Sequence, residues 1–347
     1  MQNISINGFG RIGRCFLRQA ISNPNLKILA INDLSDIDNL IYLLKHDTVY
    51  GWFNFPIQKA TTPTQFQRCQ SIGSITINNQ IIHVFKEKDP KNLPWDELSI
   101  DVTIESTGVF NNYVDSQSHI AAGSKKVIIT APAKGVEGQE GKTVLAGIND
   151  SDFSKFQIIS NGSCTTNAVA PVIKALNKTI GIEKAILNTI HAYTSTQSIV
   201  DVSAGDDFLR GRAGAQNIIP STTGAAKTTT KIISELENKF DGIAVRVPVV
   251  CGSLADLTFV SKKPTTKEEI NAVLLAASQD PELKNILAVS SEPLVSSDII
   301  KTTFPAIVDL TFTKVVDGNL VKVLIWYDNE WAYTATIIKQ ISNPLIF

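Results

Sequence analysis

The first half of the chain alternates short apolar runs with segments in which apolar residues recur at helical spacing. The apolar runs are NISIN, LKILAIND, IDVTIES, KKVIIT and FQIIS, and the helical segment RCFLRQAISN separates the first two. Apolar runs that alternate with helical patterns predict parallel strands joined by helices that cover the sheet. This half therefore predicts a doubly wound parallel sheet of the Rossmann type.

The pattern changes after about residue 180. Longer β-rich segments follow, namely AILNTIHAYT, GIAVRVPVV and SLADLTFVSKK, with an amphipathic helix at TKEEINAVLLAAS. The segment VVDGNLVKVLIWYD predicts a hairpin around Asp317-Gly318. The second half is therefore expected to be an α+β domain with a mixed or antiparallel sheet.

A chain of 347 residues exceeds what one hydrophobic core usually holds. We predict an α/β protein with a nucleotide-binding domain at 1–150 and a second domain at 151–330.

The composition excludes several classes of protein. With 43% hydrophobic and 19% charged residues it is typical of a soluble globular chain, and a net charge of -1 with scattered lysines and arginines argues against nucleic acid. The N-terminus lacks a signal-peptide pattern and no run has transmembrane length, so we expect a cytoplasmic protein without membrane contact. Four cysteines far apart, without CxxC spacing, predict reduced thiols and no metal site.

A glycine-rich turn lies near the N-terminus. Gly8, Gly10 and Gly13 fit G-x-G-x-x-G, between a strand that ends at Asn7 and a helix that begins near Arg11. In the dinucleotide fingerprint these glycines make the tight turn, admit the pyrophosphate and let helix pack on strand. Asp33 ends the next strand and would accept both ribose hydroxyls while repelling a 2′-phosphate, which favours NAD over NADP; a helix N-cap is its alternative role.

The segment SNGSCTTN, residues 160–167, places Cys164 between an apolar run and a helical pattern that continues through Pro171, where a kink is expected. A cysteine at a helix N-terminus has a lowered thiol pKa, which suits a nucleophile. A small buried hydrophobic residue is the alternative. His191, at the end of the apolar run KAILNTI, could stabilise the thiolate as imidazolium and move a proton, or could be a core histidine.

Ten motifs occur together along the whole chain: NGFGRIGR, AIND, LLKHDTVYG, ESTGVF, APAKG, SNGSCTTN, HAYTSTQ, GRAGAQNIIPSTTGAAK, RVPV and WYDNEW. In this order they resemble the phosphorylating glyceraldehyde-3-phosphate dehydrogenases. The resemblance implies that Cys164 attacks the aldehyde of glyceraldehyde 3-phosphate and that hydride passes to NAD. Inorganic phosphate then cleaves the thioester to give 1,3-bisphosphoglycerate, while His191 handles the proton.

The resemblance also implies two phosphate sites. The substrate phosphate is expected at Thr194, Arg210 and Arg246, and inorganic phosphate at Ser163, Thr165, Thr223 and Gly224. Arginine and hydroxyl groups suit phosphate. Without the resemblance, Arg210 could form a surface ion pair and the PSTTG segment a plain turn.

For the cofactor, the resemblance implies backbone contacts from Arg11 and Ile12, ribose contact from Asp33, Lys88 and Thr130 along the adenosine, and Asn329 at the carboxamide. It also implies that a C-terminal helix, 331–347, packs on the first domain, and that the chain forms a homotetramer in which 201–216 reaches toward a neighbour. Ser203 occupies a position at which a serine resembles the NADP-tolerant members of the family.

Two alternatives remain open. Erythrose-4-phosphate dehydrogenase resembles this family closely, although STTGAAK and HAYTSTQ favour the triose enzyme. A non-catalytic NAD-binding interaction protein would not need both Cys164 and His191.

Overall fold

The computed structural model describes residues 1–342, and the chain forms two compact units. Unit 1 comprises Met1–Val144, Asn149–Gly162 and the described chain from Ile337 onward; unit 2 comprises Leu145–Ile148 and Ser163–Thr336. Both contain a sheet with helices, so the fold class is α/β, as predicted.

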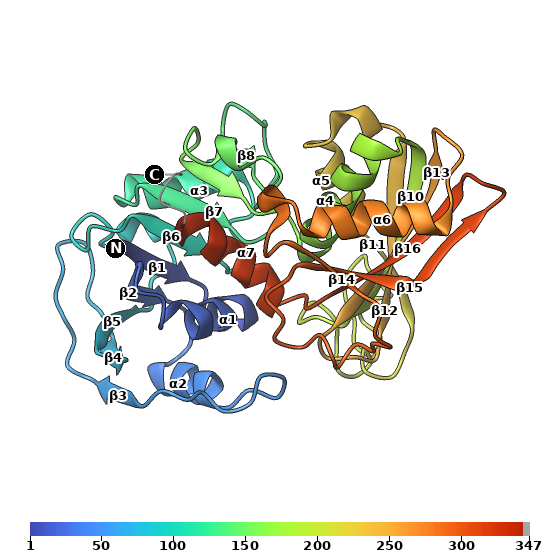
Figure 1. Ribbon diagram of the computed structural model, residues 1–347. Coiled ribbons are helices and arrows are strands. Elements are labelled where there is room, and N and C mark those ends of the chain that lie inside the picture. The colour runs from blue at the N-terminus through green and yellow to red at the C-terminus, as the bar shows by residue number, and fades with distance from the viewer. Residues whose placement is uncertain (343–347) are drawn as a thin grey trace. The chain divides into compact units, whose positions relative to one another are not determined.

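Unit 1 contains a nine-stranded sheet in which β3 and β4, and β4 and β5, pair antiparallel, whereas every other pair of neighbouring strands is parallel. Its strand order is β3-β4-β5-β2-β1-β6-β7-β9-β8, and Figure 1 shows β2, β1, β6 and β7 side by side. The order reverses direction between β1 and β6, where doubly wound folds bind nucleotides beyond the carboxyl ends of the strands. Its elements are β1 (Gln2–Asn7), α1 (Arg11–Ala20), β2 (Leu26–Asn32), α2 (Ile37–Lys45), β3 (Ile57–Ala60), β4 (Gly73–Ile77), β5 (Gln80–Phe85), η1 (Pro90–Asn92), β6 (Val102–Glu105), α3 (Tyr113–Ala121), β7 (Lys126–Ile129), β8 (Lys142–Thr143), η2 (Asp150–Asp152) and β9 (Ile158–Ser160).

Unit 2 contains a mixed seven-stranded sheet in the order β11-β12-β10-β13-β16-β15-β14. The helices α4 and α6 pack against each other and against strands of this sheet (Figure 1). Its elements are α4 (Cys164–Thr179), β10 (Ile182–Ala192), β11 (Ile219–Thr222), α5 (Ala225–Thr230), η3 (Ser234–Leu236), β12 (Phe240–Val247), β13 (Ser253–Ser261), α6 (Lys267–Ser278), η4 (Pro281–Leu283), β14 (Leu287–Ser290), β15 (Ala306–Val316) and β16 (Leu320–Tyr327), and α7 (Trp331–Ser342) begins here.

The two units divide differently from the sequence-based boundary at residue 150. Residues 151–162 belong to unit 1, because β9 pairs in parallel with β7 and so extends the first sheet. At the C-terminus, Gln340 donates from Nε2 to the carbonyl of Val144 at 3.0 Å, and both residues belong to unit 1. Residues 343–347 of the predicted C-terminal segment lie outside the described residues.

Helix α4 follows from its sequence. Val169, Val172, Ile173 and Leu176 recur at helical spacing, and all four are buried in the core of unit 2. Each such side chain contributes about 1.5–3 kcal/mol relative to exposure. The helix runs through Pro171 without ending there, because this buried face outweighs the one hydrogen bond that proline lacks.

The hairpin between β15 and β16 forms where Asp317-Gly318 predicts it. Both residues have positive φ, +48° and +71°, the backbone region that such a turn requires. Within residues 1–342 we find no helix with both the length and the apolar character needed to span a bilayer.

Candidate active site

Four neighbouring strands of unit 2 bring polar side chains to one end of the sheet. His191 on β10 is the register partner of Arg246 on β12, and Ser253 on β13 is the partner of Tyr327 on β16. Strands β10 and β13 are also neighbours, and the N–H of Ala192 donates to Ser253 Oγ at 3.1 Å. Strand pairing therefore lines up one side chain from each strand in a row.

Cys164 is the first residue of α4, as its position after an apolar run predicts. Ser163 caps the helix: its Oγ accepts from the N–H of Thr166 at 3.0 Å, and Thr166 completes a reciprocal capping box. The Cys164 sulfur is 3.4 Å from His191 Nε2. The partly exposed thiol thus has a proton acceptor within reach at the positive end of a 16-residue helix.

The other ring nitrogen of His191 has two neighbours. Nδ1 is 2.6 Å from the carbonyl oxygen of Ala192 and 2.5 Å from Arg246 Nη1. A carbonyl only accepts and a guanidinium only donates, so the two contacts of Nδ1 require different tautomers and cannot both be hydrogen bonds at once. Arg246 Nη1 also donates to the Ala192 carbonyl oxygen at 3.1 Å. When Nδ1–H donates to that same carbonyl, Nε2 keeps the lone pair that can take a proton.

Burial favours the neutral forms of this pair. It raises the pKa of the Cys164 thiol, and burial together with the charge of Arg246 lowers the pKa of His191 to about 3. These directions are opposite to the expected thiolate–imidazolium pair, because desolvation outweighs the nearby charges. Arg246 acts in the other direction on the thiol, since its positive charge lowers the pKa of Cys164.

Tyr327 lies beneath this pair and sequence reasoning missed it. Its hydroxyl is 2.9 Å from Thr165 Oγ1 and 2.6 Å from Thr189 Oγ1, and its ring lies edge-on to His191 with centroids 6.0 Å apart. Burial raises its pKa. The available signal was the alternation of β16, in which Val323, Ile325 and Tyr327 share the buried face.

The residues expected at phosphate sites have different surroundings. The Thr165 hydroxyl is buried and already paired with Tyr327. Thr194 is half-buried, and its Oγ1 pairs with Thr196 at 2.9 Å. Thr223 accepts at Oγ1 from the N–H of Ala225 at 3.2 Å, and Gly224 precedes α5 on the surface.

Arg210 is exposed and forms an ion pair with Asp207 at 2.8 Å. This is the surface pair that residue-level reasoning allowed. Its charge nonetheless contributes to lowering the pKa of Arg246, after the larger effect of burial. Within residues 1–342, Arg246 contacts His191, whereas Arg210 does not.

The glycine-rich turn of unit 1 brings backbone atoms close to two of its three glycines. A Cβ on Gly8, where φ is +90°, would lie 2.6 Å from the backbone nitrogen of Thr107, and a Cβ on Gly13 would lie 2.3 Å from the Gly8 carbonyl oxygen. A Cβ on Gly10 would meet no described atom within 4 Å. Among residues 1–342, no side chain caps the N-terminus of α1. The open space beside an uncapped helix end fits a pyrophosphate.

Asp33 follows β2 and lies beside this turn. Its Oδ2 accepts from the N–H of Phe9 at 2.8 Å and its Oδ1 from that of Ser35 at 2.9 Å. Asp36, not Asp33, is the residue that precedes α2 at the cap position. Asp33 therefore does not cap the helix, and it lines a cavity of about 410 Å³ together with Gly8, Gly10, Leu34, Lys88 and Thr107.

The remaining cofactor candidates differ in accessibility. The Arg11 guanidinium pairs with Asp47 at 2.7 Å. The candidate contact of Arg11 with a cofactor is therefore its backbone N–H rather than its side chain. Ile12 is half-buried in the same turn of helix. Lys88 is exposed at the rim of the cavity, whereas Thr130 follows β7 and donates its N–H to the Glu105 carbonyl at 2.9 Å.

Asn329 follows β16 in unit 2 and is almost fully buried. Its Oδ1 accepts from the N–H of Gly252 at 3.1 Å and from Ser253 Oγ at 2.9 Å. The side-chain oxygen is thus held by the protein.

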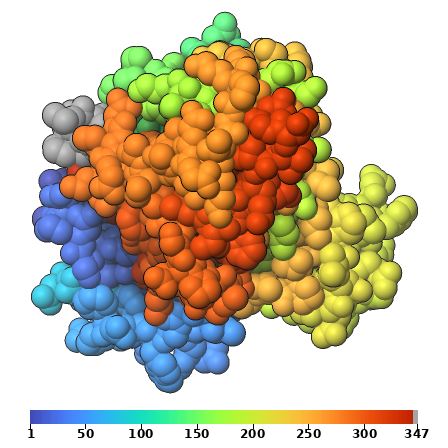
Figure 2. Space-filling model, turned by 45° about the vertical axis from the view of Figure 1, so that its right-hand side comes forward, coloured from blue at the N-terminus to red at the C-terminus, as the bar shows by residue number. Residues whose placement is uncertain are grey.

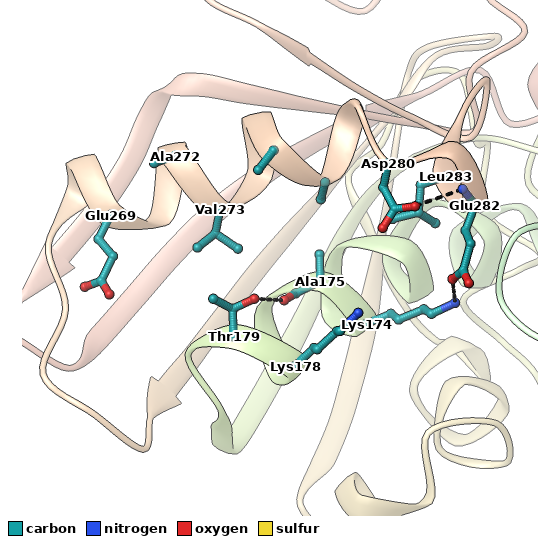
Figure 3. A pocket seen from close by; sticks show the side chains of 12 residues that line it. Lys174, Ala175, Lys178, Thr179, Glu269, Ala272, Val273, Asp280, Glu282 and Leu283 are labelled. Carbon is teal, nitrogen blue, oxygen red and sulfur yellow. Dashed lines mark hydrogen bonds and ion pairs between the residues drawn. The ribbon is translucent and has the colours of Figure 1, made fainter.

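Unit 2 also has a cavity of about 440 Å³ between α4 and α6 (Figure 3). Lys174 and Glu282 form an ion pair of 3.2 Å at its edge. None of the predicted site residues is among the described residues that line it.

The four cysteines are free thiols. In the part of the chain that the structure describes, we find no cluster of three or more His, Cys, Asp or Glu side chains suited to a metal ion.

Residues 2–113 match the sequence model of the glyceraldehyde 3-phosphate dehydrogenase NAD binding domain, and residues 163–329 match that of the C-terminal domain. Glyceraldehyde-3-phosphate dehydrogenase of Thermotoga maritima is 45% identical, with 98% of each chain covered. The enzyme of Borreliella burgdorferi is 44% identical over 96% of this chain and 97% of its own, and that of Geobacillus stearothermophilus is 42% identical over 96% of each. With both domains matched across the nucleotide-binding turn and the cysteine–histidine pair, the chain belongs to the glyceraldehyde-3-phosphate dehydrogenase family.

Proposed function

We propose that this protein is an NAD-dependent, phosphorylating glyceraldehyde-3-phosphate dehydrogenase that converts glyceraldehyde 3-phosphate and inorganic phosphate to 1,3-bisphosphoglycerate in glycolysis and gluconeogenesis. The observation that carries the proposal is the 3.4 Å separation of the Cys164 sulfur from His191 Nε2 in a chain of this family.

Cys164 is the nucleophile. His191 Nε2 takes the thiol proton, the sulfur bonds to the aldehyde carbon, and the carbonyl oxygen becomes the hydroxyl of a thiohemiacetal. Bound NAD supplies the hydride acceptor. After oxidation Cys164 holds the substrate as a thioester, His191 having removed the hydroxyl proton. A phosphate oxygen then attacks the thioester carbon, the C–S bond breaks, and the thiolate of Cys164 is regained.

The anions are held by charged and hydroxyl groups of unit 2. Arg246, with Thr194 and Arg210, faces the phosphate of the substrate. Ser163, Thr165, Thr223 and Gly224 face inorganic phosphate, with Thr165 contributing its backbone because its hydroxyl pairs with Tyr327. The helix N-terminus at Ser163 favours an anion at this place.

The glycine-rich turn and the further residues named below would hold NAD. Gly8, Gly10, Gly13 and the backbone of Arg11 and Ile12 hold the pyrophosphate, and Asp33 holds the adenosine ribose. Lys88 and Thr130 lie along the adenosine, and Asn329 binds the carboxamide.

The protein works in the cytoplasm as a homotetramer. Ile199, Val200, Val202 and Phe208 are exposed apolar side chains of one loop, which forms a lobe on the surface of unit 2, yellow in Figure 2. Such patches mark contact surfaces. Sedimentation velocity would give a single species near four times 37.7 kDa; a monomer would refute the assembly.

The activity is tested by NADH formation from glyceraldehyde 3-phosphate in the presence and absence of phosphate, with erythrose 4-phosphate and NADP in parallel. We expect phosphate-dependent NADH formation with the triose, and loss of at least about 10³-fold in Cys164→Ser, because a hydroxyl is not ionised at neutral pH. Preference for erythrose 4-phosphate would make the substrate wrong. Binding of NAD without turnover of either sugar would favour an interaction protein.

A further inference from the structure

Ser253 joins two parts of the candidate site through one hydroxyl. It is the first residue of β13 and is 1% exposed. Its Oγ accepts from the N–H of Ala192, the residue after His191, at 3.1 Å. The single hydroxyl proton is then available for Asn329 Oδ1, 2.9 Å away, which can only accept. Ser253 thus connects the strand that carries His191 to the amide of Asn329.

The oxygen of that amide is surrounded by donors. Besides Ser253, the N–H of Gly252 donates to Oδ1 at 3.1 Å and the Cys251 sulfur lies 3.8 Å away. Rotating the amide by 180° would set its NH2 group against the Ser253 hydroxyl and the N–H of Gly252, and an N–H left without an acceptor costs about 1–3 kcal/mol when buried. The donors therefore fix which end of the amide points outward. Within residues 1–342 the NH2 group has no hydrogen-bond partner.

The backbone around Asn329 is also fixed. The buried carboxylate of Asp328 accepts from the N–H groups of Lys301, Glu330 and Trp331 at 2.8–2.9 Å. Gly252 has a φ of +91°, and a Cβ there would lie 2.4 Å from the carbonyl oxygen of Ser296. Because both this loop and the side-chain oxygen of Asn329 are fixed, the NH2 group of Asn329 points in one direction.

We propose that Ser253 is a positioning residue that makes Asn329 a hydrogen-bond donor toward the cofactor. Asn329 then favours cofactors whose pyridine ring carries a substituent that accepts a hydrogen bond. This rests on the proposed function, in which Asn329 meets the carboxamide. Asn329 would recognise the carboxamide through its carbonyl oxygen, and the NH2 group of the carboxamide would form no hydrogen bond with Asn329.

Two NAD analogues separate the two halves of the carboxamide. 3-Acetylpyridine adenine dinucleotide keeps the carbonyl oxygen and replaces NH2 by methyl, whereas thionicotinamide adenine dinucleotide keeps NH2 and replaces oxygen by sulfur, a weak acceptor. Titration calorimetry gives a Kd for each with the full chain. We expect the acetyl analogue to bind within about threefold of NAD and the thio analogue about fivefold or more weakly, the value of one hydrogen bond.

In Ser253→Ala the ratio of the thio to the acetyl Kd falls below the wild-type value, because the amide of Asn329 loses the hydroxyl donor and only the N–H of Gly252 still opposes its rotation. Ser253→Thr keeps a hydroxyl and restores the ratio. Ser261→Ala is the matched control: Ser261 ends the same strand, is buried, and donates to the Lys263 carbonyl at 2.6 Å. It leaves the ratio at the wild-type value.

Weaker binding of the acetyl than of the thio analogue by the wild-type protein would overturn the proposal, because Asn329 would then present its oxygen. Equal weakening of both analogues in Ser253→Ala, with the ratio kept, would reduce Ser253 to a structural residue. The wild-type comparison decides the orientation even if Ser253→Ala does not fold. None of these measurements needs turnover, so they are independent of the activity test.

Discussion

Arg246 influences both members of the cysteine–histidine pair. Its Nη1 lies 2.5 Å from His191 Nδ1 and 3.1 Å from the carbonyl oxygen of Ala192. Its charge favours the neutral imidazole and also favours the thiolate. An arginine inside an apolar strand is seldom unpaired, and here its neighbours are the His191 ring and a backbone carbonyl.

Replacing Arg246 by methionine is expected to slow alkylation of Cys164. The charge that lowers the thiol pKa is lost, so less thiolate is present at pH 7, and a shift of one pKa unit corresponds to about tenfold in rate. The rate of iodoacetamide labelling, corrected with Cys164→Ser, measures the effect.

Arg212→Met is the control, because Arg212 is exposed and pairs with Asp201 at 3.0 Å. Equal rates in Arg246→Met and the wild-type protein would show that Arg246 does not set the reactivity of the thiol.

At the scale of elements, the turn between β1 and α1 separates two functions of glycine. Gly13 is needed for packing, since a Cβ would meet the Gly8 carbonyl oxygen at 2.3 Å, whereas Gly10 adjoins open space and has an ordinary φ of -73°. Packing therefore constrains Gly13, whereas the described structure leaves room for a side chain at Gly10.

Gly10→Ala should keep the melting temperature and weaken NAD binding by on the order of tenfold, because the methyl group occupies space that the pyrophosphate approaches. Gly13→Ala should lower the stability by about 1–3 kcal/mol through overpacking. Calorimetric melting and NAD titration of the two variants provide the comparison. Unchanged NAD affinity in Gly10→Ala would argue against a pyrophosphate at this turn.

The sequence predicts elements well where one local pattern suffices. The strand that ends at Asn7, the helix after Arg11 and the helix at Cys164 all follow from apolar spacing and turn residues. The pairing of His191 with Arg246, or of Ser253 with Tyr327, could not be predicted, because register depends on strands far apart in the chain. For the same reason Ser253 and Tyr327 were missed, although Tyr327 lies within the motif WYDNEW and Ser253 a few residues after RVPV.

The whole molecule has a net charge near zero, so its response to pH depends on particular buried groups. Lys126 opens β7, and its Nζ donates to the carbonyl oxygens of Phe153 and Phe156. Burial lowers the pKa of Lys126 from 10.5 to about 8. Between these two values the unfolded chain binds more protons than the folded chain, so stability rises with pH across this range.

Lys126→Met removes this contribution. We expect the difference in melting temperature, wild type minus variant, to increase from pH 7 to pH 10, by an amount equivalent to about 1–2 kcal/mol after allowance for solvent screening. Lys125→Met is the control, because the exposed Lys125 pairs with Asp101 at the surface. A difference in melting temperature between wild type and Lys126→Met that stays the same from pH 7 to pH 10 would contradict the expected burial cost.

The row of side chains across β12, β10, β13 and β16 has a consequence for changes in chain length. Successive side chains of a strand point to opposite faces, so one residue inserted in β10 just before His191 would turn its ring away from Arg246. At the other end of β10 the pairing with β13 already contains an irregularity between Ile182 and Lys184. A single-residue insertion there would be absorbed without moving His191, so tolerance to insertions along this strand should increase with distance from His191.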